Sequence, residues 1–247
     1  MPVVLLHGVP ETPALWGPLR AVLGRSDVLA PALPGFGRPL PEGFAAAKED
    51  YVAWLVGELE ACQDAGPVDL VGHDWGGLLV VRLVSTRPDL VRSWATDAAG
   101  GGSGAWRWHP LARIWQTPGA GEAWVRDALA SAPADRAGWF VDAGVPADDA
   151  LRMAGWLDET MGAAILALYR SAVDVGEEWT PAFRDVAAPG LALIPSDDPF
   201  GRVDRAKAGA AQSGAAVADL PGLGHWWMLQ DPAHAATVLT QFWAALG

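Results

Sequence analysis

Residues 68–79 of this 247-residue chain, Val-Asp-Leu-Val-Gly-His-Asp-Trp-Gly-Gly-Leu-Leu, decide its fold. A short, mostly apolar run leads into a glycine-rich turn, and an apolar helical pattern follows at once. The pattern predicts a buried strand that turns sharply into a helix. Glycines two residues before and two residues after Asp74 permit the tight turn, so we expect the Asp74 side chain to project above the edge of a sheet.

A side chain presented in this way occupies a nucleophile elbow, here with aspartate in the place of the usual serine. A carboxylate is ionised at pH 7 and needs no base in order to attack, which suits displacement at a tetrahedral carbon. The product would be an alkyl ester on Asp74. Aspartate is also favoured at the first position of a helix, and this stretch by itself leaves both interpretations open.

On both sides of this stretch, short apolar runs alternate with helical patterns. Each run has four to six residues and is bounded by Gly, Pro or Asp, as in strands buried on both faces of a parallel sheet. The alternation predicts a doubly wound α/β fold with a sheet of six strands. The predicted strands are 3–6, 28–33, 68–71, 93–96, 191–194 and 216–220, and the predicted helices are 48–63, 78–86, 204–212 and 232–246.

The alternation is interrupted between residues 100 and 187. The run Gly-Gly-Gly-Ser-Gly at 100–104 has the composition of a linker, and the patterns that follow are helical with no convincing strand. We therefore predict an α/β core made of residues 1–99 and 188–247, with a helical cap formed by residues 100–187.

Composition excludes several classes of protein. A net charge of −12 with only 17 basic residues argues against nucleic acid or an anionic membrane as partner. The single cysteine, Cys62, excludes an internal disulfide and a cysteine-based zinc site. No apolar run approaches the roughly 18 residues that span a bilayer, and no basic leader precedes the first strand. We expect a cytoplasmic protein with a small-molecule substrate and with neither metal nor cofactor.

Only two of the basic residues are lysines, and alanine and glycine are abundant. This composition is typical of a GC-rich coding sequence and fits a bacterial protein of secondary metabolism.

Two further motifs complement Asp74. His7-Gly8-Val9-Pro10 follows the first strand, and a turn there can aim the amides of Val9 and Trp75 at a developing oxyanion. His7 itself lies at a strand end and is expected to bond backbone groups. His225 stands in a glycine-rich loop before the last helix, which suits a mobile general base.

A histidine base needs an acid to orient it, and the chain offers three candidates. Asp197 and Asp198 follow the strand predicted at 191–194, and Asp97 follows the strand at 93–96. Position alone leaves the choice between the two loops open.

Five motifs together resemble the α/β-hydrolase superfamily in the correct order over nearly the whole chain. They are HGVPE at 7–11, PGFG at 34–37, GHDWGG at 72–77, SDDPF at 196–200 and GLGHW at 222–226. The Asp-Trp elbow is similar to that of the epoxide hydrolase and haloalkane dehalogenase branch. IWQTPGAGE at 114–122 and LYR at 168–170 resemble cap motifs of epoxide hydrolases, which makes that class the favoured one.

The resemblance implies a two-step hydrolysis of an epoxide. Asp74 attacks a ring carbon, and Tyr169 donates a hydrogen bond or a proton to the ring oxygen. His225 then activates water to hydrolyse the ester, and the family pattern places its acid directly before Pro-Phe, which favours Asp198 over Asp197. The Val9 and Trp75 amides hold the oxyanion of this second step.

The chain departs from the family in three respects, one of which is Ser-Asp-Asp at 196–198 in place of the more usual Gly at the start of the acid loop. Epoxide hydrolases usually have two cap tyrosines, whereas the first position aligns with Leu111 here and only Tyr169 remains. An indole of Trp106, Trp108 or Trp115, or the ring of His109, could share the activation of the ring oxygen. The hairpin that opens the family's sheet is also missing, so we expect an exposed edge that a homodimer or another element of the chain would cover.

Seven of the 14 tryptophans fall within the predicted cap. We expect a broad apolar pocket for a neutral, polycyclic or aromatic epoxide, lined by Trp106, Trp108, His109, Trp115 and Trp226.

Haloalkane dehalogenation is the nearest alternative function. Haloalkane dehalogenases use the same aspartate, histidine and acid, and the Trp75 N–H could bind the halide, but they usually have Asn where Val9 stands. A non-catalytic protein that binds an apolar ligand is the third interpretation, and the absence of any Gly-x-Ser-x-Gly disfavours a serine esterase.

Overall fold

A computed structural model describes residues 1–62, 66–99, 107–184 and 186–247. Its six strands are all parallel and form one sheet in the order β2-β1-β3-β4-β5-β6, which confirms the predicted fold. The strands are β1 (Val3–Leu6), β2 (Val28–Leu29), β3 (Val68–Gly72), β4 (Val91–Thr96), β5 (Gly190–Pro195) and β6 (Ala216–Leu220).

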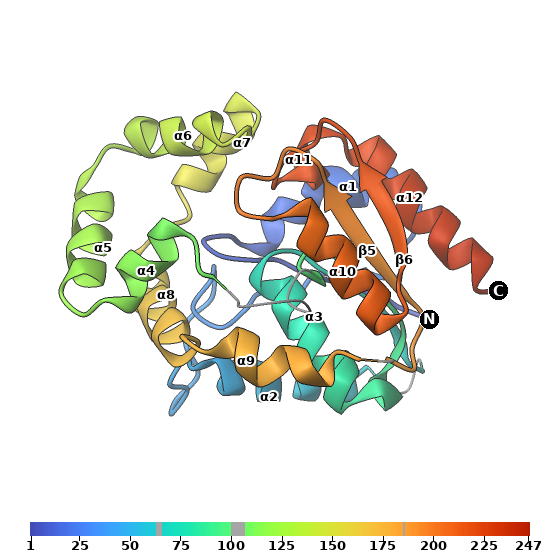
Figure 1. Cartoon of the computed structure of the whole chain (residues 1–247). Coiled ribbons are helices and arrows are strands. Elements are labelled where there is room, and N and C mark those ends of the chain that lie inside the picture. Colours follow the sequence, from blue (N-terminus) through green and yellow to red (C-terminus); the bar gives the residue numbers. More distant parts are fainter. Residues whose placement is uncertain (63–65, 100–106, 185) are drawn as a thin grey trace.

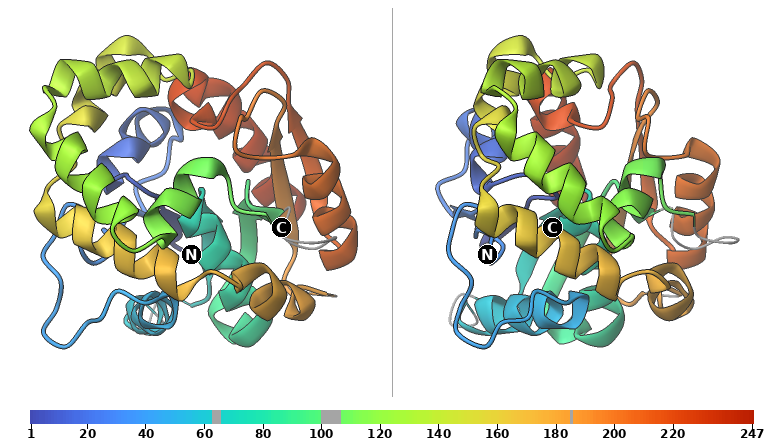
Figure 2. Two further views of the ribbon diagram at one scale, coloured as in Figure 1. Left: turned by 60° about the vertical axis from the view of Figure 1, so that its left-hand side comes forward. Right: turned by 90° about the vertical axis from the view of Figure 1, so that its left-hand side faces the viewer.

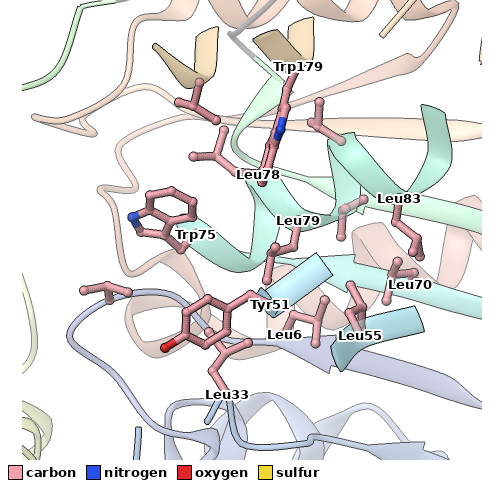
Figure 3. Packing of buried hydrophobic residues seen from close by; sticks show 14 of the residues in the cluster. Leu6, Leu33, Tyr51, Leu55, Leu70, Trp75, Leu78, Leu79, Leu83 and Trp179 are labelled. Atoms are coloured by element: carbon pink, nitrogen blue, oxygen red, sulfur yellow. The ribbon is translucent and has the colours of Figure 1, made fainter. Parts of the chain in front are cut away.

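Helices cover both faces of the sheet, and successive strand residues point to opposite faces. Leu70 packs in the cluster beneath α2 (Lys48–Glu60), α3 (Trp75–Thr86) and α10 (Val203–Ser213), as Figure 3 shows for α3. Its neighbour Val71 packs on the other face. That face is covered by α1 (Gly17–Val22), α11 (Trp227–Gln230) and α12 (Pro232–Ala245).

Helices α1 and α11 were not predicted from the sequence, and one strand and one helix differ clearly from their predicted bounds. The strand predicted at 28–33 ends at Leu29, because Pro31 and Pro34 cannot donate backbone hydrogen bonds to a neighbouring strand. Helix α3 begins at Trp75 instead of Leu78, so it starts directly after the expected nucleophile.

All the regular secondary structure in the described part of the insertion, 107–184, is helical. Its helices lie to one side of the sheet (Figures 1 and 2), and they pack into both buried clusters of the core. The boundaries proposed between core and cap stay a prediction. The helices are α4 (Pro110–Gln116), α5 (Ala120–Ala130), α6 (Pro133–Asp142), α7 (Ala147–Ala154), α8 (Glu159–Ser171), α9 (Val175–Trp179) and the short 3-10 helix η5 (Thr180–Ala182).

Strands β2 and β6 form the two edges of the sheet. Dimerisation through the edge next to β1 stays a prediction. Within the four described ranges, every helix is too short or too polar to cross a membrane.

Candidate active site

Asp74 lies at the sharp turn between β3 and α3, with backbone angles φ 50° and ψ −118° that are strained for a residue with a side chain. Glycines on both sides make the turn possible. A Cβ atom at Gly72 would overlap the carbonyl of Gly76, and a Cβ at Gly76 would overlap the carbonyl of Leu6. The turn presents the Asp74 side chain, 22% exposed, at the carboxyl end of the sheet.

The two oxygens of Asp74 have different surroundings. The Val9 amide donates a hydrogen bond of 2.9 Å to Oδ1, whereas Oδ2 lies 3.9 Å from Nε2 of His225. The backbone N–H of Trp75, the first residue of α3, has no acceptor among the described residues, as is usual at a helix N-terminus. Two amides flanking Asp74 are therefore the expected oxyanion donors, and Oδ2 is the oxygen left free to attack.

His225 contacts Asp198 and neither of the other candidate acids. Its Nδ1 lies 3.0 Å from Oδ2 of Asp198, whose Oδ1 accepts a hydrogen bond from the Phe200 amide at 2.8 Å. Asp197 accepts instead from the hydroxyl of Ser196 at 2.6 Å. The structure thus brings Asp74, His225 and Asp198 together in the arrangement expected for a nucleophile, a base and an orienting acid.

Asp97, the third candidate acid, serves a different histidine. Its Oδ2 lies 2.5 Å from Nδ1 of His73 and accepts a hydrogen bond from the indole of Trp227 at 2.7 Å. Its Oδ1 accepts from the backbone N–H of Asp74 at 3.0 Å. Asp97 therefore fixes the backbone of the elbow at Asp74.

Glu11 completes a group that sequence reasoning missed. Its Oε1 lies 3.1 Å from Nε2 of His73 and accepts a hydrogen bond of 2.6 Å from the indole of Trp226. We call Glu11, His73 and Asp97 the buried cluster. A usable signal was present in the sequence, because these polar residues end or follow three strands whose carboxyl ends meet at one edge.

The ionisation of these groups follows from burial and from neighbouring charges. Burial raises the pKa of Asp74 to about 6, although the charges of His225 and His73 act in the opposite direction. Burial lowers the pKa of His225, but Asp198 and Asp74 outweigh it, and the resulting pKa lies above 6.5. The pKa of Asp198 falls to about 2, because its partner His225 outweighs the effect of burial.

The buried cluster is more strongly charged. Burial opposes ionisation of His73, yet Glu11 and Asp97 together raise its pKa well above 6.5. The pKa of Glu11 falls to about 2, because the positive charge of His73 outweighs burial. At neutral pH this cluster is therefore one imidazolium between two carboxylates.

An apolar cavity between core and cap opens onto Asp74 and His225. Tyr169 of α8 is buried in its wall, with its ring centre 4.7 Å from that of Trp115 and 5.5 Å from that of Trp75. Burial and the nearby Asp74 charge raise the pKa of Tyr169 well above 10, so its hydroxyl stays protonated. Other residues in the wall are His109, Leu111, Trp124, Trp139, Phe200 and Trp226.

One of the expected pocket residues, Trp108, borders a different cavity. This second cavity is more polar and also reaches Asp74, and the indole of Trp108 donates to the carbonyls of Ala172 and Val173 at 3.2 Å. Its N–H is thus already bonded to the cap backbone. Trp106 lies outside the described residues.

His7 is structural, as expected. Its Nδ1 lies 2.9 Å from the carbonyl of Gly8, and its Nε2 accepts a hydrogen bond from the Leu33 amide at 3.1 Å. Burial lowers its pKa to about 4, so it is neutral at pH 7.

Three side chains could bring ligand atoms to a metal ion. Atoms of Glu11, His73 and His225 lie within 4.8 Å of one another. Both ring nitrogens of His73 are engaged with carboxylates, however, and its positive charge would repel a cation. The donor set does not suit a metal in this protonation state.

A model of an alpha/beta hydrolase family matches residues 3–236. Among curated proteins, (E)-2-((N-methylformamido)methylene)succinate hydrolase of Acinetobacter baylyi is 27% identical over 207 residues, which cover 80% of this chain and 73% of that protein. A haloalkane dehalogenase of Psychrobacter cryohalolentis is 38% identical over 95 residues, covering 36% of this chain and 30% of that protein.

Solved structures share the fold at lower sequence identity. An epoxide hydrolase from Vigna radiata superposes with a TM-score of 0.77 at 18% identity, covering 99% of this chain and 91% of that one. Haloalkane dehalogenase DbeA from Bradyrhizobium elkani gives a TM-score of 0.73 at 22% identity, covering 99% and 91%. These likenesses establish the fold, and the chemistry must be argued from the residues.

Proposed function

Because the chain belongs to the alpha/beta hydrolase family, we propose that it opens an epoxide to a vicinal diol through an ester on Asp74. The observation that carries the proposal is the pairing of Asp74 with a protonated Tyr169 in the wall of one apolar cavity. A carboxylate nucleophile suits attack at a tetrahedral carbon, and a phenol beside it can stabilise the oxygen that leaves.

In the first step, Oδ2 of Asp74 forms a bond to a ring carbon and the bond from that carbon to the ring oxygen breaks. The electron pair goes to the oxygen, which accepts a hydrogen bond and then the proton of Tyr169. The raised pKa of Tyr169 keeps this proton in place until the alkoxide forms. The phenolate regains a proton from solvent before the next turnover.

Formation of the ester changes His225. The negative charge of Asp74 is one of the causes that raise the pKa of this histidine, and the ester removes it. His225 can then lose its proton and accept another from water. Hydroxide attacks the ester carbon, and negative charge develops on Oδ1 beside the Val9 and Trp75 amides. The bond to the diol oxygen breaks as that oxygen takes the proton from His225.

Haloalkane dehalogenation is the second candidate, favoured by the similarity of part of the chain to curated haloalkane dehalogenases. The same Asp74, His225 and Asp198 would serve it, with halide as the leaving group. Val9 offers no side-chain donor to a halide, and a halide needs no proton from Tyr169. Val9 and Tyr169 therefore favour an epoxide over a haloalkane as the substrate.

The two candidates separate in one experiment. The purified protein is incubated with styrene oxide and, in parallel, with 1-bromobutane, and diol and bromide are measured. We expect diol without bromide, whereas bromide without diol would reverse the order of the candidates. If neither product forms while the ligands bind, the protein is a binding protein. Asp74→Asn is the control for background hydrolysis.

A single turnover in ¹⁸O-water tests the ester. With enzyme in excess, the new diol oxygen comes from Asp74, so the first diol carries no label and the enzyme gains one heavy oxygen. Label in the first diol would mean direct attack by water and would exclude the ester.

A further inference from the structure

Arg136 is a buried cation in the wall of the substrate cavity. It lies on α6 of the cap, is 8% exposed, and borders the same apolar cavity as Asp74 and Tyr169. The sequence alone assigns no cation to this cavity, because Arg136 occupies an ordinary position in an amphipathic helix.

Among the described residues, the guanidinium of Arg136 donates hydrogen bonds to backbone carbonyls only. Its Nε donates to the carbonyl of Ala154 at 2.9 Å, and its Nη1 donates to the carbonyls of Ala128 and Ser131 at 2.8 and 2.6 Å. These carbonyls end helices α7 and α5, where the helix dipoles place partial negative charge. The contacts fix the plane of the guanidinium.

Arg136 lacks a full counter-ion. None of the acids in the described ranges lies within 4.0 Å of its nitrogens, and Nη2 has no acceptor there. A buried charge without a partner is costly, and partial charges at helix ends offset only part of that cost. An anion that enters the cavity would find one oriented cation in surroundings of low dielectric constant.

The other ionisable groups of the cavity wall do not replace it. Burial lowers the pKa of His109 to about 4, so that ring is neutral at pH 7, and Tyr169 stays protonated. His225 is paired with Asp198 and stands beside Asp74. A negatively charged group is therefore attracted to Arg136 and repelled by Asp74.

We propose that Arg136 binds a carboxylate of the substrate, so that the substrate is an epoxide acid with an apolar body. This inference rests on the proposed function for the reactive end of the molecule, whereas the carboxylate site stands on the contacts of Arg136. Attraction at one end and repulsion at the other give the substrate one orientation and present the ring carbon to Asp74.

Binding of unreactive probes tests the site. The affinities of 3-phenylpropionate and its neutral analogue 3-phenylpropanamide for the full chain are measured by calorimetry. We expect the acid to bind about tenfold more tightly or better, as for a hydrogen bond to a charged group. This preference should vanish in Arg136→Gln. Equal affinities in the wild type, or an unchanged preference in the variant, would overturn the proposal.

Arg152→Gln is the matched control. Arg152 lies on α7, its side chain is 61% exposed, and it pairs with Asp149. Arg152→Gln removes one positive charge, as Arg136→Gln does, but from a side chain outside the cavity. It should therefore keep the preference for the acid over the amide.

Arg136 also caps two helices, so Arg136→Gln can fail to fold. In that case Arg136→Lys, which keeps the cation and loses the planar fork, should weaken the acid and leave the amide unchanged; equal weakening of both would overturn the proposal.

Reactive probes separate this inference from the proposed function. The wild type should convert 3-phenylglycidate to its diol with a kcat/KM about tenfold or more above that for 3-phenylglycidamide. Equal kcat/KM values would refute the carboxylate site and leave the epoxide hydrolase standing. If neither compound gives diol while the acid still binds more tightly than the amide, epoxide hydrolysis is refuted and the carboxylate site at Arg136 stands.

Discussion

Two histidines stand side by side at the carboxyl end of the sheet, yet their surroundings differ. The ring centres of His73 and His225 lie 4.5 Å apart, and each histidine lies between two carboxylates. His73 is completely buried, with both nitrogens bonded to Glu11 and Asp97. His225 is 7% exposed and borders the cavity, and its Nε2 lies 3.9 Å from Asp74.

Because their surroundings differ, we expect the two histidines to have different roles. His73 is a fixed cation that offsets part of the negative charge of Glu11 and Asp97 and opposes the rise in the pKa of Asp74. His225 borders the cavity in which we propose that substrate binds, and the charge of Asp74 is one of the causes that raise its pKa. In the function that we propose, the fixed charge of His73 supports the elbow, and the exchangeable proton of His225 takes part in hydrolysis of the ester.

The largest expected effect comes from removing the exchangeable proton. His225→Gln should lower turnover by a factor on the order of 10⁴. Alkylation of Asp74 should continue, so intact-mass spectrometry should show the protein with one added epoxide. His234→Gln, at the start of α12, is the control and should behave as wild type. Normal turnover without an adduct in the His225 variant would contradict the second step.

Removing the fixed charge should act on stability. His73→Gln leaves Glu11 and Asp97 buried without their cation, which should lower the free energy of unfolding by about 3–5 kcal/mol in urea at pH 7. His225→Gln should cost less, because water in the cavity can solvate Asp198. A similar loss of unfolding free energy in His73→Gln and His225→Gln would contradict the different roles of the two histidines.

Much of this arrangement could be predicted from the sequence, because it depends on local patterns. Short apolar runs predicted five of the six strands nearly whole, and the resemblance to the family, through its Asp-Pro-Phe motif, pointed to Asp198 as the partner of His225. The buried cluster could not be found this way. Glu11 and His73 meet across 62 residues, and only the order of the strands brings them together. Arg136 is similar, because its burial depends on helix ends from α5 and α7.

The charge of Asp74 should cost stability, as expected for a nucleophile in a dry site. Its pKa of about 6 in the folded chain exceeds the ordinary 3.8, so stability is full below pH 3.8 and falls as the pH rises to 6. Because Asp74 is 22% exposed, we expect Asp74→Asn to gain about 2 kcal/mol at pH 8 and nothing at pH 3.5. Urea unfolding at both pH values measures this.

The same pKa governs activity in the opposite direction. The ionised carboxylate is the attacking form, so kcat/KM for the wild type should rise with pH to a plateau with a midpoint near 6. A flat profile between pH 5 and 8 would mean that ionisation of Asp74 does not limit attack.

The smallest effect tests how firmly the buried cluster is held. Trp226→Phe removes the indole that donates to Glu11 at 2.6 Å, whereas Trp115→Phe removes a buried indole N–H with no hydrogen-bond partner among the described residues. Both variants lose the same ring volume, so the difference between their free energies of unfolding isolates the hydrogen bond. We expect Trp226→Phe to cost about 1.5 kcal/mol more, as for a bond to a charged group. Equal losses would show that the Trp226 indole adds nothing to the stability of the buried cluster, and Glu11 would then be held by His73 and by the Gly8 amide.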